Sequence, residues 1–301
     1  MRSGFVTVLG RPNVGKSTLI NQIIGEKVTI TSSRPNTTRH QIRGVLSRPD
    51  AQVVFVDTPG LHRPKTKLGQ RLNDSALSAL DDVDVLVAMV EASAAIGPGD
   101  RNVLSRALAA AAASGAPLLV VVNKTDKGGA ARTAEQLVKV SAEIDAAAAS
   151  HGERGRQAAA LTEYFPISAK TAAGVEALLD AVVARLDEGP PYYPDEMISD
   201  QSEAEHVAEL VREQLLERTR DELPHAIYCR VSEWDNMRIR VEILVERDSQ
   251  KGIVIGKGGE ILKAVGSAVR EQLAPGTHLE LVVKVEKRWQ SRSEVLDRFG
   301  L

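Results

Sequence analysis

The 301-residue sequence has few of the features that mark secreted proteins or proteins that coat nucleic acid. Its single cysteine, Cys229, cannot form an internal disulfide, so we expect a reducing, intracellular compartment. Cys229 lies in a β-rich run, which favours a half-buried strand position over a reactive thiol. With 38 basic and 40 acidic residues the net charge is -2, which argues against coating nucleic acid by bulk charge and leaves only a local basic patch open.

A long apolar run is also missing. The most apolar stretch, residues 107–122, is broken by Ser114, Gly115 and Pro117, which predicts a helix end, a turn and a buried strand instead of a membrane span. The N-terminus goes directly into a strand pattern, so we expect no signal peptide. These features favour a cytoplasmic protein.

The length favours two domains. A proline-rich stretch, residues 189–195, stops a helix and stiffens an extended connector. We therefore predict a first domain over residues 1–188, a linker over 189–202 and a second domain over 203–301.

The first domain alternates short β-rich runs with helical stretches. This pattern predicts an α/β fold, a mostly parallel sheet with helices on both faces. Residues 16–24 have helical periodicity, with Gly25 as the C-terminal cap, and residues 42–47 suit one antiparallel edge strand. The predicted strands are residues 5–9, 53–57, 84–90, 118–122 and 164–167. Residues 107–113 and 146–149 are rich in alanine and are expected on surface helices, and parts of 128–155 are expected to form a mobile insertion.

The second domain begins with apolar residues at helical spacing between Val207 and Leu216. Strands over 226–231 and 237–245, a glycine-rich turn, a helix over 260–273 and a strand over 279–285 follow. This order predicts a smaller α+β domain.

The strongest motif lies between the first strand and the first helix, and it fits the phosphate-binding P-loop pattern. Its backbone N–H groups and the helix N-terminus can surround phosphate oxygens. Lys16 can reach the outer phosphates, and the Ser17 hydroxyl can bind Mg²⁺. The predicted phosphate-binding residues are Gly10, Arg11, Pro12, Asn13, Val14, Gly15, Lys16, Ser17 and Thr18.

A second motif, Asp57-Thr58-Pro59-Gly60, follows a β-rich run. An acid at the end of a strand is suited to hold Mg²⁺ through water, and the Gly60 N–H can sense a γ-phosphate.

Asn123-Lys124-Thr125-Asp126 follows another apolar strand. The Asp126 carboxylate can accept two hydrogen bonds from guanine, which selects GTP over ATP. Ser168, Ala169 and Lys170 form a further loop whose backbone N–H groups are predicted to face guanine O6.

Between these motifs, the polar, proline-containing segment 31–40 is suited to order over a γ-phosphate and to be released after hydrolysis. We expect Thr38 to close over Mg²⁺, with Thr37 as the alternative, since Thr37 could instead be a capping or turn residue. Lys16, Thr38 and Gly60 are the predicted catalytic residues.

The sequence predicts slow hydrolysis. Leu61 occupies the place where a glutamine orients the attacking water in Ras-like enzymes. His62 is better interpreted as a surface histidine than as a base, and Arg11 and Arg39 are candidates to neutralise developing charge. We expect slow intrinsic turnover that a partner or an ion accelerates.

In the second domain, the loop from Gly256 through Lys257 and Gly258 to Gly259 is expected between a strand and a helix. It has the G-x-x-G pattern of KH modules, which clamp about four single-stranded nucleotides. Lys251 and Lys263 lie nearby in sequence, so one basic face is predicted to bind RNA. Trp289 is interpreted as packing between domains, with stacking on a base as the alternative.

The combined motifs resemble those of the bacterial Era GTPases over nearly the full length. The resemblance implies a Ras-like GTPase domain and a type II KH domain. It also implies slow hydrolysis of GTP with Mg²⁺ and binding to the 3′ end of small-subunit (16S) ribosomal RNA on the pre-30S particle during ribosome assembly. Peripheral contact with the cell membrane, a potassium ion held with the help of Asn13, a monomer and no DNA partner are further implications. The stretches that carry the resemblance are Gly10–Thr18, Thr37–His40, Asp57–His62, Asn123–Asp126, Tyr192–Pro194, Glu222–Pro224 and Val254–Gly256.

Two classes of function remain open at this point. The chain is either a GTPase whose nucleotide state times its RNA binding, or an RNA-binding scaffold with a mainly structural nucleotide site. Lys16, Ser17 and Asp57 favour the enzyme. A tandem GTPase of the Der type or a modification GTPase of the MnmE type fits poorly, because the sequence has one P-loop and no C-terminal cysteine.

Overall fold

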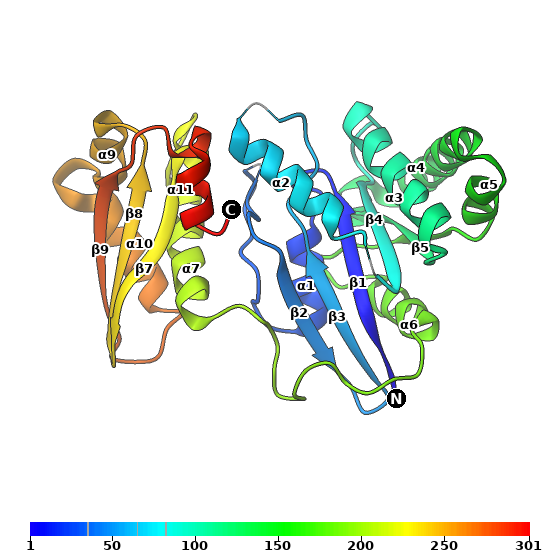
Figure 1. Cartoon of the computed structure of the whole chain (residues 1–301), viewed down its shortest axis with the longest axis horizontal. Helices are drawn as coiled ribbons and strands as arrows, with labels where there is room; N and C mark the ends of the chain where they lie inside the picture. The colour runs from blue at the N-terminus through cyan, green and yellow to red at the C-terminus, as the bar shows by residue number, and fades with distance from the viewer. Residues whose placement is uncertain (35, 65, 82) are drawn as a thin grey trace. The chain divides into compact units, whose positions relative to one another are not determined.

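The computed structural model describes residues 1–34, 36–64, 66–81 and 83–301 (Figure 1). Pro35, in the segment predicted to order over a γ-phosphate, lies outside them. The chain divides into two compact units. The first comprises residues 1–29, 38–64 and 69–200, and the second comprises residues 30–37, 65–68 and 201–301.

A six-stranded sheet organises the first unit, in the order β2-β3-β1-β4-β5-β6. All neighbouring strands are parallel except β2, which pairs with β3 in antiparallel register at the edge. The mostly parallel sheet and its antiparallel edge strand are thus confirmed. The strands are β1 (Arg2–Gly10), β2 (Ile42–Ser47), β3 (Ala51–Asp57), β4 (Val85–Glu91), β5 (Leu118–Asn123) and β6 (Glu163–Pro166).

Helices cover both faces of this sheet because alternate strand residues face opposite sides. On β4, Val87 belongs to the apolar cluster beneath α1 and α6, whereas Ala88 belongs to the cluster beneath α2, α3 and α4. The predicted first helix has the expected bounds, and Gly25 ends it in left-handed conformation. The helices are α1 (Lys16–Ile24), α2 (Lys67–Ser78), α3 (Pro98–Ser114), α4 (Thr125–Ala148), the short η1 (Ala149–His151), α5 (Gly152–Ala160) and α6 (Val175–Arg185).

The alanine-rich stretches differ from expectation. Ala107 and Ala111 on α3 are buried, so this side of the helix is a core face and not a surface. Residues 128–155, expected to include a mobile insertion, form most of α4, all of η1 and the start of α5. Val140, Ile144 and Ala148 recur every four residues and are buried. The helices were predicted correctly and Ala146 and Ala149 are exposed as expected, whereas the buried face of α3 and the helical structure of 128–155 were not foreseen. Alanine completes an apolar stripe while adding little hydrophobicity of its own.

The predicted linker packs against the first unit as far as Asp200. The buried Gln52 side chain accepts hydrogen bonds from the backbone N–H groups of Tyr192 (2.7 Å) and Tyr193 (3.0 Å), and donates to the Tyr193 carbonyl (2.8 Å). Further along, the Val45 N–H of β2 donates to the Ile198 carbonyl (2.9 Å). The connector therefore covers the free edge of β2.

The second unit has a three-stranded sheet in the order β7-β8-β9, in which β7 and β8 are antiparallel and β8 and β9 are parallel. The helices α7 and α10 share an apolar cluster with one face of the sheet. The elements are α7 (Glu203–Arg218), α8 (Leu223–Ala226), β7 (Tyr228–Asp235), β8 (Arg238–Val245), α9 (Asp248–Ile255), η2 (Lys257–Gly259), α10 (Glu260–Arg270), β9 (His278–Val285), η3 (Trp289–Ser291) and α11 (Ser293–Arg298).

Aromatic side chains gather within the second unit. Tyr228 stacks on Phe299 with ring centroids 4.2 Å apart. Trp289 is fully buried against both rings, and its indole N–H donates to the Ala226 carbonyl (2.9 Å). Trp289 therefore packs inside this unit, and not between domains as expected, which also excludes stacking on a base in this conformation.

The predicted RNA loop follows helix α9, and the expectation of a preceding strand was wrong. Gln250 explains the helix: its side-chain oxygen accepts the backbone N–H groups of Glu246 (2.9 Å) and Arg247 (3.1 Å). This arrangement satisfies donors at the helix start and turns the chain out of β8.

Candidate functional site

The predicted phosphate and base motifs lie at one edge of the six-stranded sheet. Residues 10–17, 57–60, 123–126 and 168–170 follow the carboxyl ends of β1, β3, β5 and β6. Ligands of open parallel sheets bind at this edge. The topology therefore gathers four segments that are far apart in sequence.

The P-loop is a tight, internally braced turn. Asn13 and Gly15 have φ angles of 65° and 108°, in the left-handed region. The Lys16 ammonium is buried and donates to the carbonyls of Gly10 (3.2 Å) and Arg11 (3.3 Å). Burial lowers the pKa of Lys16 to about 8, against the opposing effect of Asp57. Lys16 therefore keeps its proton at pH 7, beside the N-terminus of α1.

Three oxygen-bearing side chains meet beside Lys16. The Asp57 Oδ2 atom accepts hydrogen bonds from the hydroxyls of Ser17 (2.8 Å) and Thr38 (3.1 Å), whose oxygens are 3.2 Å apart. Burial raises the pKa of Asp57, while Lys16 and the two hydroxyls oppose the shift. The buried Oδ1 atom makes no hydrogen bond among the described residues.

This cluster fits Mg²⁺, which prefers oxygen ligands and keeps several waters. Ser17 and Thr38 can supply hydroxyl ligands, and the Oδ1 atom of Asp57 can accept from a metal-bound water. The hydroxyl of Thr37 instead donates to the Arg34 carbonyl (2.7 Å), as expected for a turn residue. Of the two adjacent threonines, the geometry favours Thr38.

The segment after Asp57 lies directly against the P-loop. The Thr58 hydroxyl donates to the Val8 carbonyl (2.8 Å). A Cβ atom on Gly60 would lie 2.5 Å from the Pro12 nitrogen, so only glycine allows this approach. Leu61 is buried in the apolar cluster under α3, where it cannot orient water.

His62 and the two candidate arginines are held by the protein. The Nδ1 atom of His62 lies 3.0 Å from the Gly60 carbonyl oxygen, and Asn73 bonds both backbone groups of His62. The Arg11 guanidinium pairs with Asp100 (2.6 Å), and Arg39 is buried. In this conformation Arg11 is directed to α3.

The predicted base-reading residues also brace the P-loop. The Asn123 side chain donates to the Val14 carbonyl (2.8 Å), and the Lys124 ammonium donates to the Asn13 carbonyl (2.7 Å). The Ser168 hydroxyl donates to the Asp126 carboxylate (2.7 Å), which fixes the acid that would read guanine.

The loop after β6 differs in one respect from expectation. The Ser168 N–H donates to the Ala173 carbonyl (2.9 Å), and the Ala169 N–H donates to the Asn123 side-chain oxygen (2.9 Å). Neither group therefore faces a base in this conformation, because the protein itself satisfies both donors. Lys170 is exposed at the end of the same turn.

Two acidic residues of the site were missed from the sequence. Glu91 accepts from the Lys124 ammonium (2.7 Å) and the Ser93 hydroxyl (2.6 Å). Burial would raise the pKa of Glu91, but these two hydrogen bonds, together with the positive charges of Lys124 and Lys127, outweigh it and lower that pKa. Asp100 pairs with Arg11 and caps α3 through the Gly97 N–H (2.9 Å). Glu91 is the last residue of β4, just as Asp57 is the last residue of β3, and this position could have indicated that Glu91 belongs to the site.

The G-x-x-G loop of the second unit exposes its backbone. Gly256, Gly258 and Gly259 have φ angles of 77°, 62° and 81°. A Cβ atom on Gly256 would lie 2.9 Å from the Ile261 nitrogen, whereas nothing lies within 4 Å of one on Gly258 or Gly259. The open side of the loop suits close approach of a nucleotide backbone.

The basic residues around this loop lie on α9, η2 and α10. Lys257 and Lys263 are exposed, and Lys251 is half-buried. In the later basic run, Lys284 pairs with Glu242 and Arg292 pairs with Glu286, which reduces the positive charge there.

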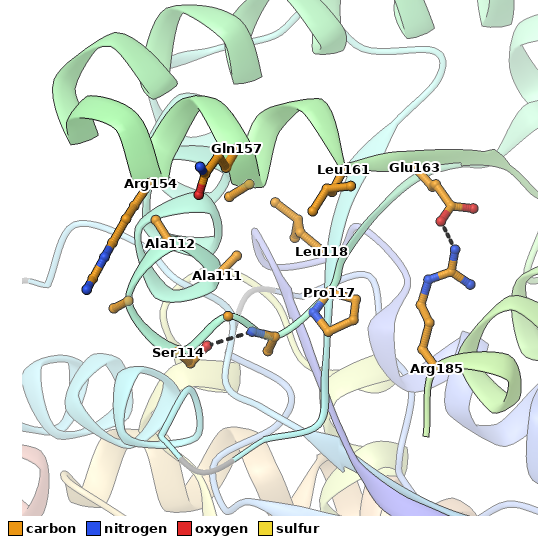
Figure 2. Close-up of a pocket in the computed structure, with 14 residues that line it drawn as sticks. Ala111, Ala112, Ser114, Pro117, Leu118, Arg154, Gln157, Leu161, Glu163 and Arg185 are labelled. Carbon is orange, nitrogen blue, oxygen red and sulfur yellow. Dashed lines mark hydrogen bonds and ion pairs between the residues drawn. The ribbon is translucent and has the colours of Figure 1, made fainter. Parts of the chain in front are cut away.

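A cavity of about 560 Å³ lies away from these motifs (Figure 2). It is lined by the end of α3, the start of β5, α5 and the Arg185–Glu163 ion pair. It therefore meets the amino end of β5, opposite to the motif-bearing edge of the sheet.

Among the described residues, no helix combines the length and apolarity needed to cross a bilayer.

Comparison with known proteins agrees with this geometry. Residues 5–124 match the family described as 50S ribosome-binding GTPase, and residues 222–290 match the KH domain family. The chain is 46% identical to GTPase Era of Mycobacterium avium (strain 104), over 99% of this chain and 98% of that protein. It is 44% identical to GTPase Era of Mycobacterium tuberculosis (strain ATCC 25177 / H37Ra), over 99% and 98%.

Two solved structures are similar over the whole length. Era in complex with MgGDPNP and nucleotides 1506-1542 of 16S ribosomal RNA has a TM-score of 0.87 and 35% identity, over 100% of this chain and 99% of that chain. A variant of Aquifex aeolicus Era, with one tyrosine replaced by alanine and bound to GDP.AlF4-, has a TM-score of 0.86 and 35% identity, with the same coverage. The phosphate motifs, the α/β sheet, the KH unit and these full-length similarities together place the chain in the family of Era GTPases.

Proposed function

We propose that this chain uses Mg²⁺ and the P-loop site to bind and hydrolyse GTP, and that the bound nucleotide times its contact with ribosomal RNA. The observation that supports this most directly is the meeting of Ser17, Thr38 and Asp57 beside the buried Lys16. When bound, Mg²⁺ would neutralise phosphate charge. Lys16 stabilises the outer phosphates, Thr38 closes the site, and the Gly60 N–H faces the γ-phosphate.

The proposed RNA partner is single-stranded small-subunit rRNA near its 3′ end. The similar Era structure holds nucleotides 1506-1542 of 16S ribosomal RNA, and this chain shares its full-length fold. The glycine loop of the KH unit and its exposed lysines supply the complementary chemistry. We place the chain on the pre-30S particle during small-subunit assembly, with a nucleotide domain over 1–188 and an RNA domain over 203–301.

The proposed water activation does not use a side chain at position 61, because Leu61 is buried. We infer instead that a potassium ion, held with the help of the exposed Asn13, supplies positive charge near the phosphates. Without this ion the positive charge would be missing, so GTP hydrolysis should be slow.

We also propose that the protein is a cytoplasmic monomer that contacts the inner face of the membrane peripherally. The support is the family membership, and with a net charge of -2 any attraction to anionic lipid must come from local basic patches. Sedimentation of the purified protein, alone and with anionic vesicles, measures both properties.

Replacing Asp126 by Asn is expected to move nucleotide preference from guanine to xanthine. The carboxylate can pair with the guanine N1–H and amino group, and an amide cannot accept both bonds. Competition binding with GDP and xanthosine diphosphate measures the change. Asp145→Asn, an exposed acid on the same helix, should leave the preference unchanged. Retained guanine selectivity in Asp126→Asn would refute the assignment.

Replacing Thr38 by Ala is expected to reduce single-turnover GTP hydrolysis about tenfold or more, because a Mg²⁺ ligand and its bond to Asp57 are lost. A magnesium titration should show a raised requirement. Thr37→Ala is the matched control, since that hydroxyl donates to the Arg34 carbonyl and not to the Asp57 cluster. An equal loss in the two variants would contradict the role of Thr38.

Hydrolysis by the unmodified protein is expected to be about tenfold faster in potassium chloride than in sodium chloride at equal ionic strength, because the proposed site holds K⁺ and not the smaller Na⁺, and only a held cation stabilises the charge of the transition state. Single-turnover assays measure the two rates. Rapid hydrolysis without potassium or a partner would argue against ion assistance.

Affinity for a single-stranded RNA with the 3′-terminal 16S sequence is expected to differ between protein loaded with GDP and protein loaded with GDPNP. Lys257→Gln should weaken binding with either nucleotide and reduce the salt slope by about 1. Lys139→Gln, an exposed lysine on α4, should change neither quantity. Equal affinities with the two nucleotides would favour the scaffold alternative.

A further inference from the structure

The segment just before Thr38 is part of the second compact unit. Residues 30–37 cluster with residues 201–301, whereas Thr38 belongs to the first unit with Ser17 and Asp57. Ile30 is buried in the apolar core that α7 shares with β7 and β8. The chain therefore leaves the second unit at the peptide bond that joins Thr37 to Thr38.

Charged groups of α7 hold this segment by its backbone. The Glu213 carboxylate accepts the Thr31 N–H (2.9 Å), and the Arg212 guanidinium donates to the Thr37 carbonyl. In return, the Arg34 guanidinium donates to the Thr219 carbonyl just after the helix (3.1 Å). Contacts at both ends and in the middle thus hold the segment along α7.

Arg212 is an unusual residue for a helix that packs on a sheet. Its side chain is fully buried, and its charge is balanced by Glu209, whose Oε1 accepts from Nε (2.7 Å). A buried guanidinium is tolerated only when its charge and its donors have partners. The Thr37 carbonyl is one of these partners, and Nη1 makes no hydrogen bond among the described residues. The network is therefore incompletely satisfied and sensitive to the position of Thr37.

The position of Thr37 is linked to the magnesium site by covalent geometry. Adjacent Cα atoms are about 3.8 Å apart, and the peptide group between them is planar. A backbone movement that carries Thr38 toward the magnesium site, or away from it, therefore also moves the peptide group that Thr38 shares with Thr37. The Thr37 carbonyl of that group is the acceptor of the bond from Arg212.

We propose that Arg212 is a positioning residue that couples α7 to the occupancy of the magnesium and γ-phosphate site. Its hydrogen bond to the Thr37 carbonyl keeps Thr38 in position over the site. When Thr38 leaves that position, the bond to Arg212 changes, and Arg212 belongs to the helix that packs on the KH sheet. This inference rests on the proposed function of Thr38. Thermodynamic linkage makes this coupling reciprocal. If binding of the γ-phosphate stabilises one conformation of α7, then stabilising that conformation of α7 raises the affinity for the γ-phosphate by the same factor.

Arg212→Met tests the proposal, because methionine is unbranched, fills much of the same space and cannot donate to Thr37. The expected result is a fall of about tenfold in the ratio of GDPNP affinity to GDP affinity in Mg²⁺, with GDP affinity unchanged. Arg212→Lys, which keeps a donor and the charge, should recover part of the ratio. Arg218→Met is the matched control, since the hydrogen bonds of Arg218 to the described residues stay within α7.

A purely structural role predicts a different result. Arg212→Met would then lower thermal stability and weaken both nucleotides equally, and an unchanged ratio in the folded variant would overturn the proposal. If the variant does not fold, hydrogen exchange of the unmodified full chain replaces it. Amides of residues 31–37 and 203–218 should change protection together between MgGDP and MgGDPNP, and exchange that changes in only one segment would also overturn the coupling.

These measurements need no RNA, so they are separable from the proposed function. If RNA affinity of the unmodified protein is the same with both nucleotides, the timing of RNA binding fails while the coupling through Arg212 can still hold. If Thr38→Ala leaves hydrolysis unchanged, the proposed role of Thr38 fails first.

Discussion

The motif-bearing edge of the six-stranded sheet is organised around one buried carboxylate. Asp57 ends strand β3 with no exposure to solvent, and one of its oxygens accepts hydrogen bonds from the hydroxyls of Ser17 and Thr38. A buried charge requires partners, and here they come from the P-loop helix and from the segment that closes the site. Lys16 provides the opposite charge, and it opposes the rise that burial causes in the pKa of Asp57. Burial remains the larger effect and leaves the pKa of Asp57 raised, so the partners reduce the cost of the buried charge without removing it.

The residues expected to read guanine also support the phosphate loop. Asn123 and Lys124 hold carbonyls of the P-loop, while Glu91 anchors the lysine. Ser168 fixes Asp126. A substitution among the residues expected to bind the base therefore also alters the P-loop, because hydrogen bonds join the two loops. Nucleotide specificity and phosphate geometry share one network, so the effects of substitutions in the two motifs should not simply add.

Local patterns predicted much of this molecule. The P-loop, the bounds of α1 and the edge strand β2 were readable, since each depends on a short motif or a period. Helix α9 was missed because the β-branched residues in this stretch favour a strand. The capping interaction of Gln250, which stabilises the helix, leaves only a weak signal in the sequence. The pairs Arg11–Asp100 and Arg212–Thr37 were inaccessible for a stronger reason. They join residues 89 and 175 positions apart, and only the fold brings them together. Sequence periodicity carries no record of such contacts.

The connector after the first domain has a consequence for how the chain can be divided. Gln52 and Val45 bond its backbone, and Ser199 forms a bridge with Gly44 of the edge strand. A fragment cut at residue 188 would deprive the buried Gln52 of its hydrogen bonds to Tyr192 and Tyr193 and would uncover one side of β2. Bare sheet edges recruit strands from other molecules. An autonomous nucleotide-binding fragment should therefore extend to Asp200, because the connector protects the sheet from self-association as well as joining the two domains.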